Sequence, residues 1–236
     1  MMTIAIMQPY LFPYIGYFQL IHAVDRFVIY DDVNFIKRGW IARNNILVNG
    51  KANLFTVPLE SASQNNKINQ IRIKKDIYQT WSSKFLKTLE QSYKKAPFYK
   101  DVAPIVVSLL THKYDYIIDL ARNSIASICE YLEMNTTIIT TSILYNNHRL
   151  NAQDRIIDIC NKEDADCYIN AIGGQELYNK EAFSEQGIKL FFLKPKNATY
   201  LQFGNEFVPW LSIIDVLMFN SIEDIQKKLL PAYQLI

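Results

Sequence analysis

The residues best suited to chemistry lie directly after two short apolar runs near the start of the chain. Gln8 follows the first run, and Asp31 and Asp32 follow the second. A carboxylate in such a place can act as a base or accept a hydrogen bond from a substrate hydroxyl, and an amide can read polar groups. Neighbouring side chains of an extended segment point to opposite faces, so we expect one carboxylate to face a crevice and the other to be structural or solvated.

A group of cations around an aromatic residue follows these carboxylates. Lys37 and Arg43 flank Trp40, and Asn44 comes directly after Arg43. Guanidinium groups bind phosphate or carboxylate through paired hydrogen bonds, and an indole ring stacks on a planar or sugar ring. The grouping predicts a holder for an anionic group of a substrate. A second interpretation stays open, in which the preceding carboxylates simply neutralise the cations.

The segment between Tyr10 and Phe18 is rich in aromatic residues and contains Gly16. One interpretation is an aromatic wall on which a sugar or a base stacks, with Tyr10 in the wall and Gly16 allowing close approach of the backbone. The alternative is a hydrophobic cap that packs into the core. Both interpretations fit the composition of the segment.

A glycine pair forms the other candidate for contact with an anionic group. Gly173 and Gly174, followed by Gln175, come after a predicted strand and before a short helical piece. The pair lacks the full dinucleotide fingerprint, and the chain has no P-loop. The three histidines are far apart in the sequence. Since no pattern of histidine, cysteine and carboxylate stands out, we predict no metal site and no nucleophilic triad, and the sequence identifies no cofactor.

Composition limits the class of protein. Half of the 236 residues are hydrophobic, which is enough for a substantial core, and the net charge is only +2. This charge balance argues against a general nucleic-acid or anionic-membrane binder. Three irregularly spaced cysteines indicate reduced thiols. The chain shows neither a signal peptide nor an apolar window of membrane-spanning length, so we expect a soluble, cytoplasmic protein without direct membrane insertion.

The positions of the apolar residues predict an α/β fold with a Rossmann-like, mostly parallel sheet. Strands and helices alternate at both ends of the chain, and crevices at the carboxyl ends of such strands bind ligands. Strands are predicted over residues 4–7, 27–30, 137–144, 167–170 and 188–193, and helices over 14–22, 152–162, 210–219 and 222–230.

Residues 45–132 are expected to form an insert in a single α/β domain that spans residues 1–236. The Asn49-Gly50 pair between two β-rich runs predicts a hairpin, and residues 68–73 alternate as a third strand. Three helices are expected after this antiparallel element, over residues 78–93, 102–110 and 116–132.

The motifs containing these residues resemble the WbqC-like protein family along nearly the whole chain. The chain departs from the family pattern at Met7, where many relatives have His, and at Ala42, where Asn is usual. No role that depends on those two side chains is therefore carried over. The matching motifs are Met7-Gln8-Pro9-Tyr10, Pro13 through Phe18, Asp31 through Lys37 with Trp40, Arg43 and Asn44, Tyr168-Ile169-Asn170 with Gly173 through Tyr178, and Leu211 through Asp215.

The resemblance implies a role in bacterial surface-polysaccharide or O-antigen synthesis, with a small-molecule substrate such as a sugar nucleotide or an amino sugar. The expected activity is that of a transferase. In it Asp31 or Asp32 acts on a hydroxyl, Lys37 and Arg43 hold an anion, and Trp40 and Tyr10 stack a ring. Two alternatives stay open: a non-catalytic module that binds a saccharide or a glycosyltransferase, and an adenylate-forming enzyme of the HUP type. The chain looks like the opening of a HUP-type enzyme but lacks its paired-histidine motif.

Overall fold

The computed structural model describes residues 1–196, 199–204 and 206–236, and it is built on a six-stranded sheet. Five strands are parallel, and the sixth pairs antiparallel at one edge. The spatial order is β10-β9-β8-β1-β2-β7. The strands are β1 (Thr3–Met7), β2 (Arg26–Ile29), β7 (Thr137–Ile139), β8 (Cys167–Ala171), β9 (Lys189–Pro195) and β10 (Tyr233–Leu235).

The order of the parallel strands is that of a doubly wound fold. Counted along the chain, the five parallel strands lie in the order 3-2-1-4-5, with the reversal between β1 and β8. The predicted Rossmann-like, mostly parallel sheet is therefore confirmed. In such sheets the crevice beyond the carboxyl ends of the two strands at the reversal is where ligands bind.

Helices cover both faces of the sheet because its central strands, β1, β2 and β8, are buried on both sides. Ile4 and Ile6 of β1 pack with α5 (Ala152–Lys162) and α6 (Lys180–Ser184). Ala5, between them, belongs to the opposite core, which contains α1, α4 and α7. These helices are α1 (Ile15–His22), α4 (Ile117–Tyr131) and α7 (Ile213–Phe219). The alternation along β1 follows from the two-residue period of a strand.

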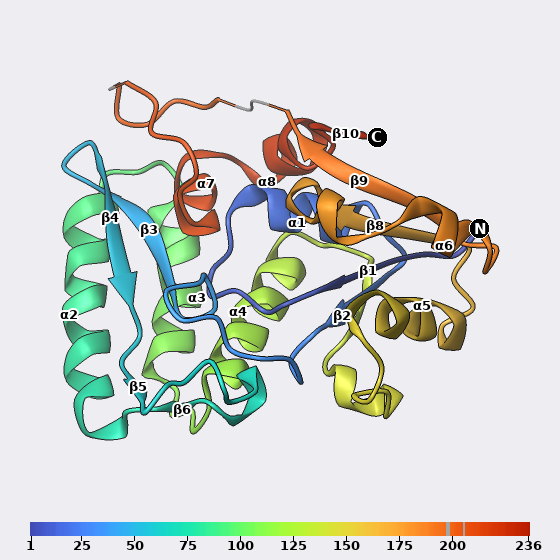
Figure 1. Cartoon of the computed structure of the whole chain (residues 1–236). Helices are drawn as coiled ribbons and strands as arrows, with labels where there is room; N and C mark the ends of the chain where they lie inside the picture. The colour runs from blue at the N-terminus through green and yellow to red at the C-terminus, as the bar shows by residue number, and fades with distance from the viewer. Residues whose placement is uncertain (197–198, 205) are drawn as a thin grey trace.

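The segment between β2 and β7 holds a β-hairpin and three helices, as the sequence predicted. Figure 1 shows the helices side by side at one end of the sheet, with the hairpin next to them. At the hairpin turn, Asn49 and Gly50 have φ angles of 51° and 74°, as a two-residue turn of this kind requires. The elements are β3 (Arg43–Val48), β4 (Lys51–Thr56), α2 (Lys75–Tyr93), α3 (Tyr99–Thr111) and α4.

Several predicted elements are shorter than expected. Residues 68–73 form a helical turn (Ile68–Gln70) followed by β6 (Arg72–Ile73), which pairs with β5 (Leu59–Glu60) rather than with the hairpin. The predicted strand over residues 137–144 ends at Ile139, because the Thr141 hydroxyl caps a helical turn over Ser142–Tyr145.

The C-terminal segment also differs from its prediction. Helix α7 begins at Ile213, where the Ser212 side chain caps it, and not at residue 210. The predicted helix over residues 222–230 consists of α8 (Ile222–Asp224) and a wider π-helical turn, Ile225–Leu229. Strand β10 was not predicted, since three residues at the end of the chain carry too little pattern.

Within the described residues, no helix is long and apolar enough to cross a membrane. The three cysteines, Cys129, Cys160 and Cys167, are buried and unbridged. Burial raises the pKa of the Cys129 and Cys160 thiols to about 12. The thiols are therefore protonated near neutral pH and pack as small apolar side chains.

Candidate functional site

A pocket of about 700 Å³ opens at the reversal of the strand order. It is lined by residues at the carboxyl ends of β1, β2 and β8, together with residues of α5 and of the loops nearby. We call it the switch-point pocket. Its lining includes five of the residues that the sequence singled out: Gln8, Tyr10, Asp32, Gly173 and Gly174.

A buried ion pair forms one wall of the switch-point pocket. The Asp32 carboxylate accepts hydrogen bonds from the Ser142 hydroxyl and from the Arg155 guanidinium through the same oxygen, Oδ1. Arg155 also lies over the Tyr30 ring, 4.8 Å from its centre, and its Nε donates to Asn147. Asp32 Oδ2 has no hydrogen-bond partner among the residues that the structure describes, so it remains available to a ligand.

The environment keeps Asp32 ionised. Burial favours the neutral carboxyl, but the hydrogen bonds from Ser142 and Arg155 outweigh burial and hold the pKa of Asp32 below its usual range. Burial raises the pKa of the neighbouring Tyr30 to about 12, although Arg155 opposes this. Near neutral pH the wall therefore presents one carboxylate, one guanidinium and one neutral phenol, and Asp32 is better suited to orienting a hydroxyl than to removing a proton.

Asp31 lies outside the switch-point pocket. Its buried carboxylate accepts hydrogen bonds from the Thr141 hydroxyl at 2.9 and 3.0 Å and from the backbone N–H of Ser142 at 3.0 Å. These bonds fix the turn that presents Ser142 to Asp32. Only Asp32 lines the pocket, while Asp31 holds the turn behind it. The expected opposite faces are not seen, because β2 ends at Ile29 and both carboxylates accept from the Ser142 hydroxyl.

Gln8 brings an unpaired amide to the pocket. Its Oε1 atom is buried, and within the described parts of the chain it has no hydrogen-bond partner. A buried polar atom without a partner is costly to the fold. Rotation of the Gln8 side chain toward the pocket would let a donor of a ligand satisfy this oxygen.

The glycine pair forms the opposite wall, and its two members differ. A Cβ atom on Gly174 would lie 2.6 Å from the side-chain nitrogen of Asn170, so this position has no room for a side chain unless Asn170 moves. Gly173 has open space around it, and Gln175 is exposed and does not line the switch-point pocket.

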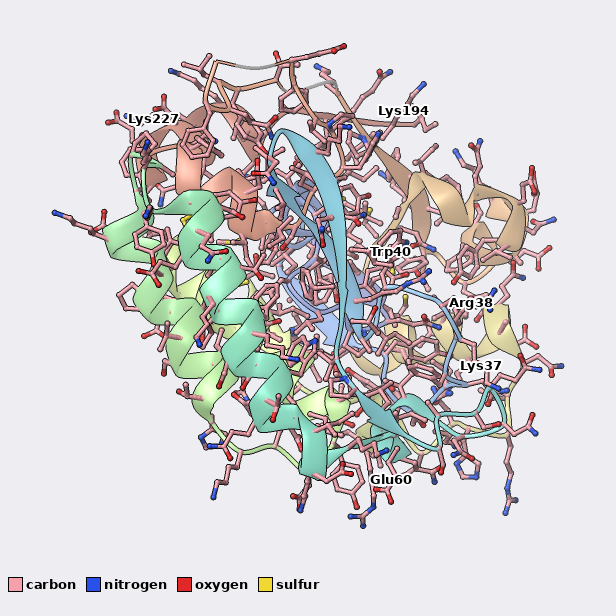
Figure 2. All side chains as sticks on the ribbon, turned by 90° about the vertical axis from the view of Figure 1, so that its left-hand side faces the viewer. Lys37, Arg38, Trp40, Glu60, Lys194 and Lys227 are labelled. Carbon is pink, nitrogen blue, oxygen red and sulfur yellow. The ribbon has the colours of Figure 1, made fainter. Side chains whose placement is uncertain are left out.

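The predicted cationic and aromatic group lies beside this pocket instead of inside it. Figure 2 shows Lys37, Arg38 and Trp40 on one loop. Lys37 is exposed and Arg43 lies 5.4 Å from the centre of the Trp40 ring, with its Nε donating to the Gly39 carbonyl. Neither cation is part of the lining of the switch-point pocket.

A second pocket, of about 270 Å³, adjoins the first. We call it the aromatic pocket, and Tyr10 lines both. Asn44 lines it, but its amide is fully used, donating to the Leu11 and Phe12 carbonyls and accepting from the next backbone N–H. Gly16 lies outside it in α1, where a Cβ atom would lie 2.4 Å from the Tyr14 ring. The lining residues are Tyr10, Pro13, Tyr14, Trp40, Asn44, Asn45 and Trp210.

The three basic residues that line the switch-point pocket, Arg155, Lys67 and His148, were not predicted as site residues. Arg155 carried a signal, because it falls one helical turn before Ile159 on the buried face of α5, where a charged residue is unexpected. Lys67 carried none. The loop before η1 (Ile68–Gln70) reaches the pocket through backbone bonds to the chain near Asp31, such as that from Ile68 to Val33.

The reversed strand order and the pocket at its switch point define a Rossmann-like α/β protein. The chain belongs to the WbqC-like protein family, whose model matches residues 8–227. It is 27% identical over 224 residues to an uncharacterized protein, Rv1507c, of Mycobacterium tuberculosis, a match that covers 93% of this chain and 94% of the relative. No solved structure matches the chain. The family resemblance found in the motifs is therefore confirmed.

Proposed function

We propose that this protein is a transferase that modifies a nucleotide-linked amino sugar during synthesis of a bacterial surface polysaccharide such as O-antigen. The observation that carries the proposal is the switch-point pocket, which combines a free carboxylate oxygen, an unpaired amide and a lysine. Its volume of about 700 Å³ suits a ligand of this size. The polysaccharide context rests on the family resemblance.

The polar groups of the pocket divide between the two parts of such a substrate. Asp32 Oδ2 and the Gln8 amide are acceptors for hydroxyl or amino groups of the sugar. Lys67 supplies a cation for the diphosphate, in place of the more distant Lys37 and Arg43. Gly173 and Gly174 shape the wall on the other side, where the open space around Gly173 leaves room for the ligand.

His148 is the group that we assign to proton transfer. It lines the pocket on the loop before α5, and no side chain among the described residues bonds to it. Histidine is the side chain that most often moves protons in enzymes. In the proposed reaction a sugar amine attacks the carbonyl carbon of an activated acyl or aminoacyl donor. The new C–N bond forms, the donor's leaving group departs, and the proton of the amine passes to His148.

A ligand screen tests the proposal. Sugar nucleotides, ATP and aminoacyl donors are added separately to the protein, and the melting temperature is measured. We expect at least one sugar nucleotide to raise it, the rise to disappear in Asp32→Asn, and the rise to persist in Lys37→Ala, since Lys37 lies outside the pocket. A rise that is lost in Lys37→Ala and kept in Asp32→Asn would contradict the proposed site.

A non-catalytic saccharide-binding module is the second candidate, and the exposed tryptophans of the aromatic pocket favour it. Turnover distinguishes the two. Incubation with a bound sugar nucleotide and acyl donors, followed by mass spectrometry, should reveal a heavier sugar if the protein is a transferase. Exchange of pyrophosphate into ATP would instead indicate the adenylate-forming alternative.

A further inference from the structure

The aromatic pocket exposes two tryptophans that the fold holds apart from its core. Trp40 and Trp210 are 43% and 67% exposed, while the Tyr14 ring lies 5.8 Å from that of Trp210. Trp210 has a φ angle of 60°, in the left-handed region that bulky side chains rarely adopt. Such a conformation persists only where the surrounding structure imposes it, and it is often found at binding sites.

Hydrogen bonds between distant segments impose this arrangement. The backbone N–H of Ser212 donates to Asn45 and that of Ile213 donates to Pro13, both at 2.8 Å, while that of Leu11 donates to Trp40 at 3.2 Å. The Ser212 hydroxyl also donates to the Phe12 carbonyl at 2.8 Å. The three segments that carry the walls are thus tied together, so the aromatic pocket is already formed without a ligand.

The chemistry of the lining selects a neutral ligand. None of the residues that line the aromatic pocket carries a charge, so the lining itself supplies no cation for a phosphate. The Asn45 side chain lines it and makes no hydrogen bond to the described residues, which leaves an amide free to bind hydroxyl groups. The Tyr14 and Trp210 rings are tilted by 56°. The two rings contact each other, and the exposed indole of Trp210 offers an apolar surface on which one face of a sugar ring can pack.

We infer that the aromatic pocket is a subsite for a neutral sugar ring, held between Trp40 and Trp210 with its hydroxyl groups on Asn45. Because Tyr10 lines both pockets, this ring lies next to the ligand of the switch-point pocket. One part of this inference rests on the proposed function: that the sugar ring belongs to a glycan, either attached to the ligand of the switch-point pocket or accepting a group from it. The binding of a sugar in the aromatic pocket does not rest on it.

The chain offers a direct test because it contains three tryptophans, Trp40, Trp81 and Trp210. Protein labelled with 5-fluorotryptophan gives one fluorine NMR signal for each, assigned with single Trp→Phe variants. Glucose, galactose, mannose and N-acetylglucosamine are titrated separately. We expect at least one sugar to shift the Trp40 and Trp210 signals together. Trp81 is the internal control, since it stacks on Phe85 in α2 and does not line the aromatic pocket.

Two variants sharpen the test. Asn45→Ala and Trp210→Ala should each weaken the sugar-dependent shift of Trp40 by about tenfold in affinity, while the unchanged Trp81 signal reports that each variant is folded. If no sugar moves Trp40 or Trp210, or if only a nucleotide such as UMP does, the inference is wrong.

The two proposals can fail separately. Asp32→Asn should abolish the stabilisation by sugar nucleotides without altering the shifts that free sugars cause at Trp40 and Trp210. Shifts without any binding of sugar nucleotides would overturn the proposed function and leave the sugar subsite. Binding of sugar nucleotides without shifts at Trp40 and Trp210 would overturn the sugar subsite and leave the proposed function.

Discussion

Two buried aspartates, Asp32 and Asp215, have opposite environments. Asp32 is paired with a guanidinium, and its pKa is lowered. Asp215 is fully buried, and within the described chain it has no cationic partner. It accepts hydrogen bonds from Tyr93, Tyr200 and Gln202 at 2.8, 2.6 and 2.7 Å. Burial raises the pKa of Asp215 in spite of these three bonds.

The difference separates a structural carboxyl group from one that serves a ligand. The bonds of Asp215 tie α7 to α2 and to the segment around residue 200, and both of its oxygens are used. Asp32 keeps one oxygen free at the edge of a pocket. Both residues belong to motifs that resemble the family, so presence in a motif does not by itself distinguish structure from function.

Removing the carboxyl group of Asp215 should have the largest effect on stability. Asp215→Ala leaves three buried donors without an acceptor, and we expect the free energy of unfolding to fall by about 4 kcal/mol. Urea denaturation measures this. Asp215→Asn is the matched control, because it keeps one acceptor oxygen and should cost less. A loss below about 1 kcal/mol in Asp215→Ala would show that the network is not a structural tie.

Removing Arg155, the cationic partner of Asp32, should affect both stability and binding. Arg155→Met leaves Asp32 without its partner, and we expect unfolding to become easier by about 2 kcal/mol, less than for a sealed pair because water reaches the pocket. The binding of sugar nucleotides should also be lost. Arg122→Met, which breaks a more exposed ion pair with Asp119, is the control and should change stability by under about 1 kcal/mol. Equal losses in the two variants would contradict this account.

Exchanging the carboxylates for amides should separate the two neighbouring aspartates. Asp32→Asn keeps an acceptor for Arg155 and Ser142, so stability should fall by only about 1 kcal/mol, while affinity for a sugar nucleotide should fall at least about tenfold. Asp31→Asn should instead lower stability more and leave the affinity for the sugar nucleotide nearly unchanged. Calorimetric titration together with urea denaturation measures both quantities. Equal affinities of the two variants would place the ligand away from Asp32.

The dependence of stability on pH should have opposite signs at Asp32 and Asp215. Because the folded pKa of Asp32 is lowered, its contribution is complete above the unfolded value of about 4 and is lost as pH falls through the folded value. The folded pKa of Asp215 is raised, so its contribution decreases as pH rises from about 4 through that value. The unfolding free energy of the wild type minus that of Asp32→Asn should therefore rise with pH. The unfolding free energy of the wild type minus that of Asp215→Asn should fall with pH. Slopes of the same sign would contradict the assignment.

Local patterns predicted much of the fold, since periodicity and turn chemistry act over a few residues. Asn49-Gly50 predicted the hairpin because both positions need positive φ angles. The two-residue period of a strand did not predict the directions of Asp31 and Asp32, because β2 ends at Ile29 and both carboxylates accept from the Ser142 hydroxyl. Residues 68–70 were mistaken for part of a strand because their apolar positions also fit a helical turn, and only Arg72–Ile73 of the predicted strand form one.

The candidate site was predicted only in part, because its other half comes from far along the chain. Gln8, Asp32 and Gly174 lie at strand ends, which a strand pattern locates. Arg155 reaches Asp32 from a helix 123 residues away, and no local pattern pairs them. The ring of Trp210 reaches the aromatic pocket only because backbone bonds connect its loop to the N-terminal turn.

A crystal structure of the protein with the sugar nucleotide that stabilises it most would show whether the switch-point pocket is the binding site. We expect the ligand to occupy the switch-point pocket, with a sugar hydroxyl or amine within hydrogen-bond distance of Asp32 Oδ2 and another polar group on the Gln8 amide. A ligand bound elsewhere, with the pocket between β1 and β8 left empty, would contradict the proposed site.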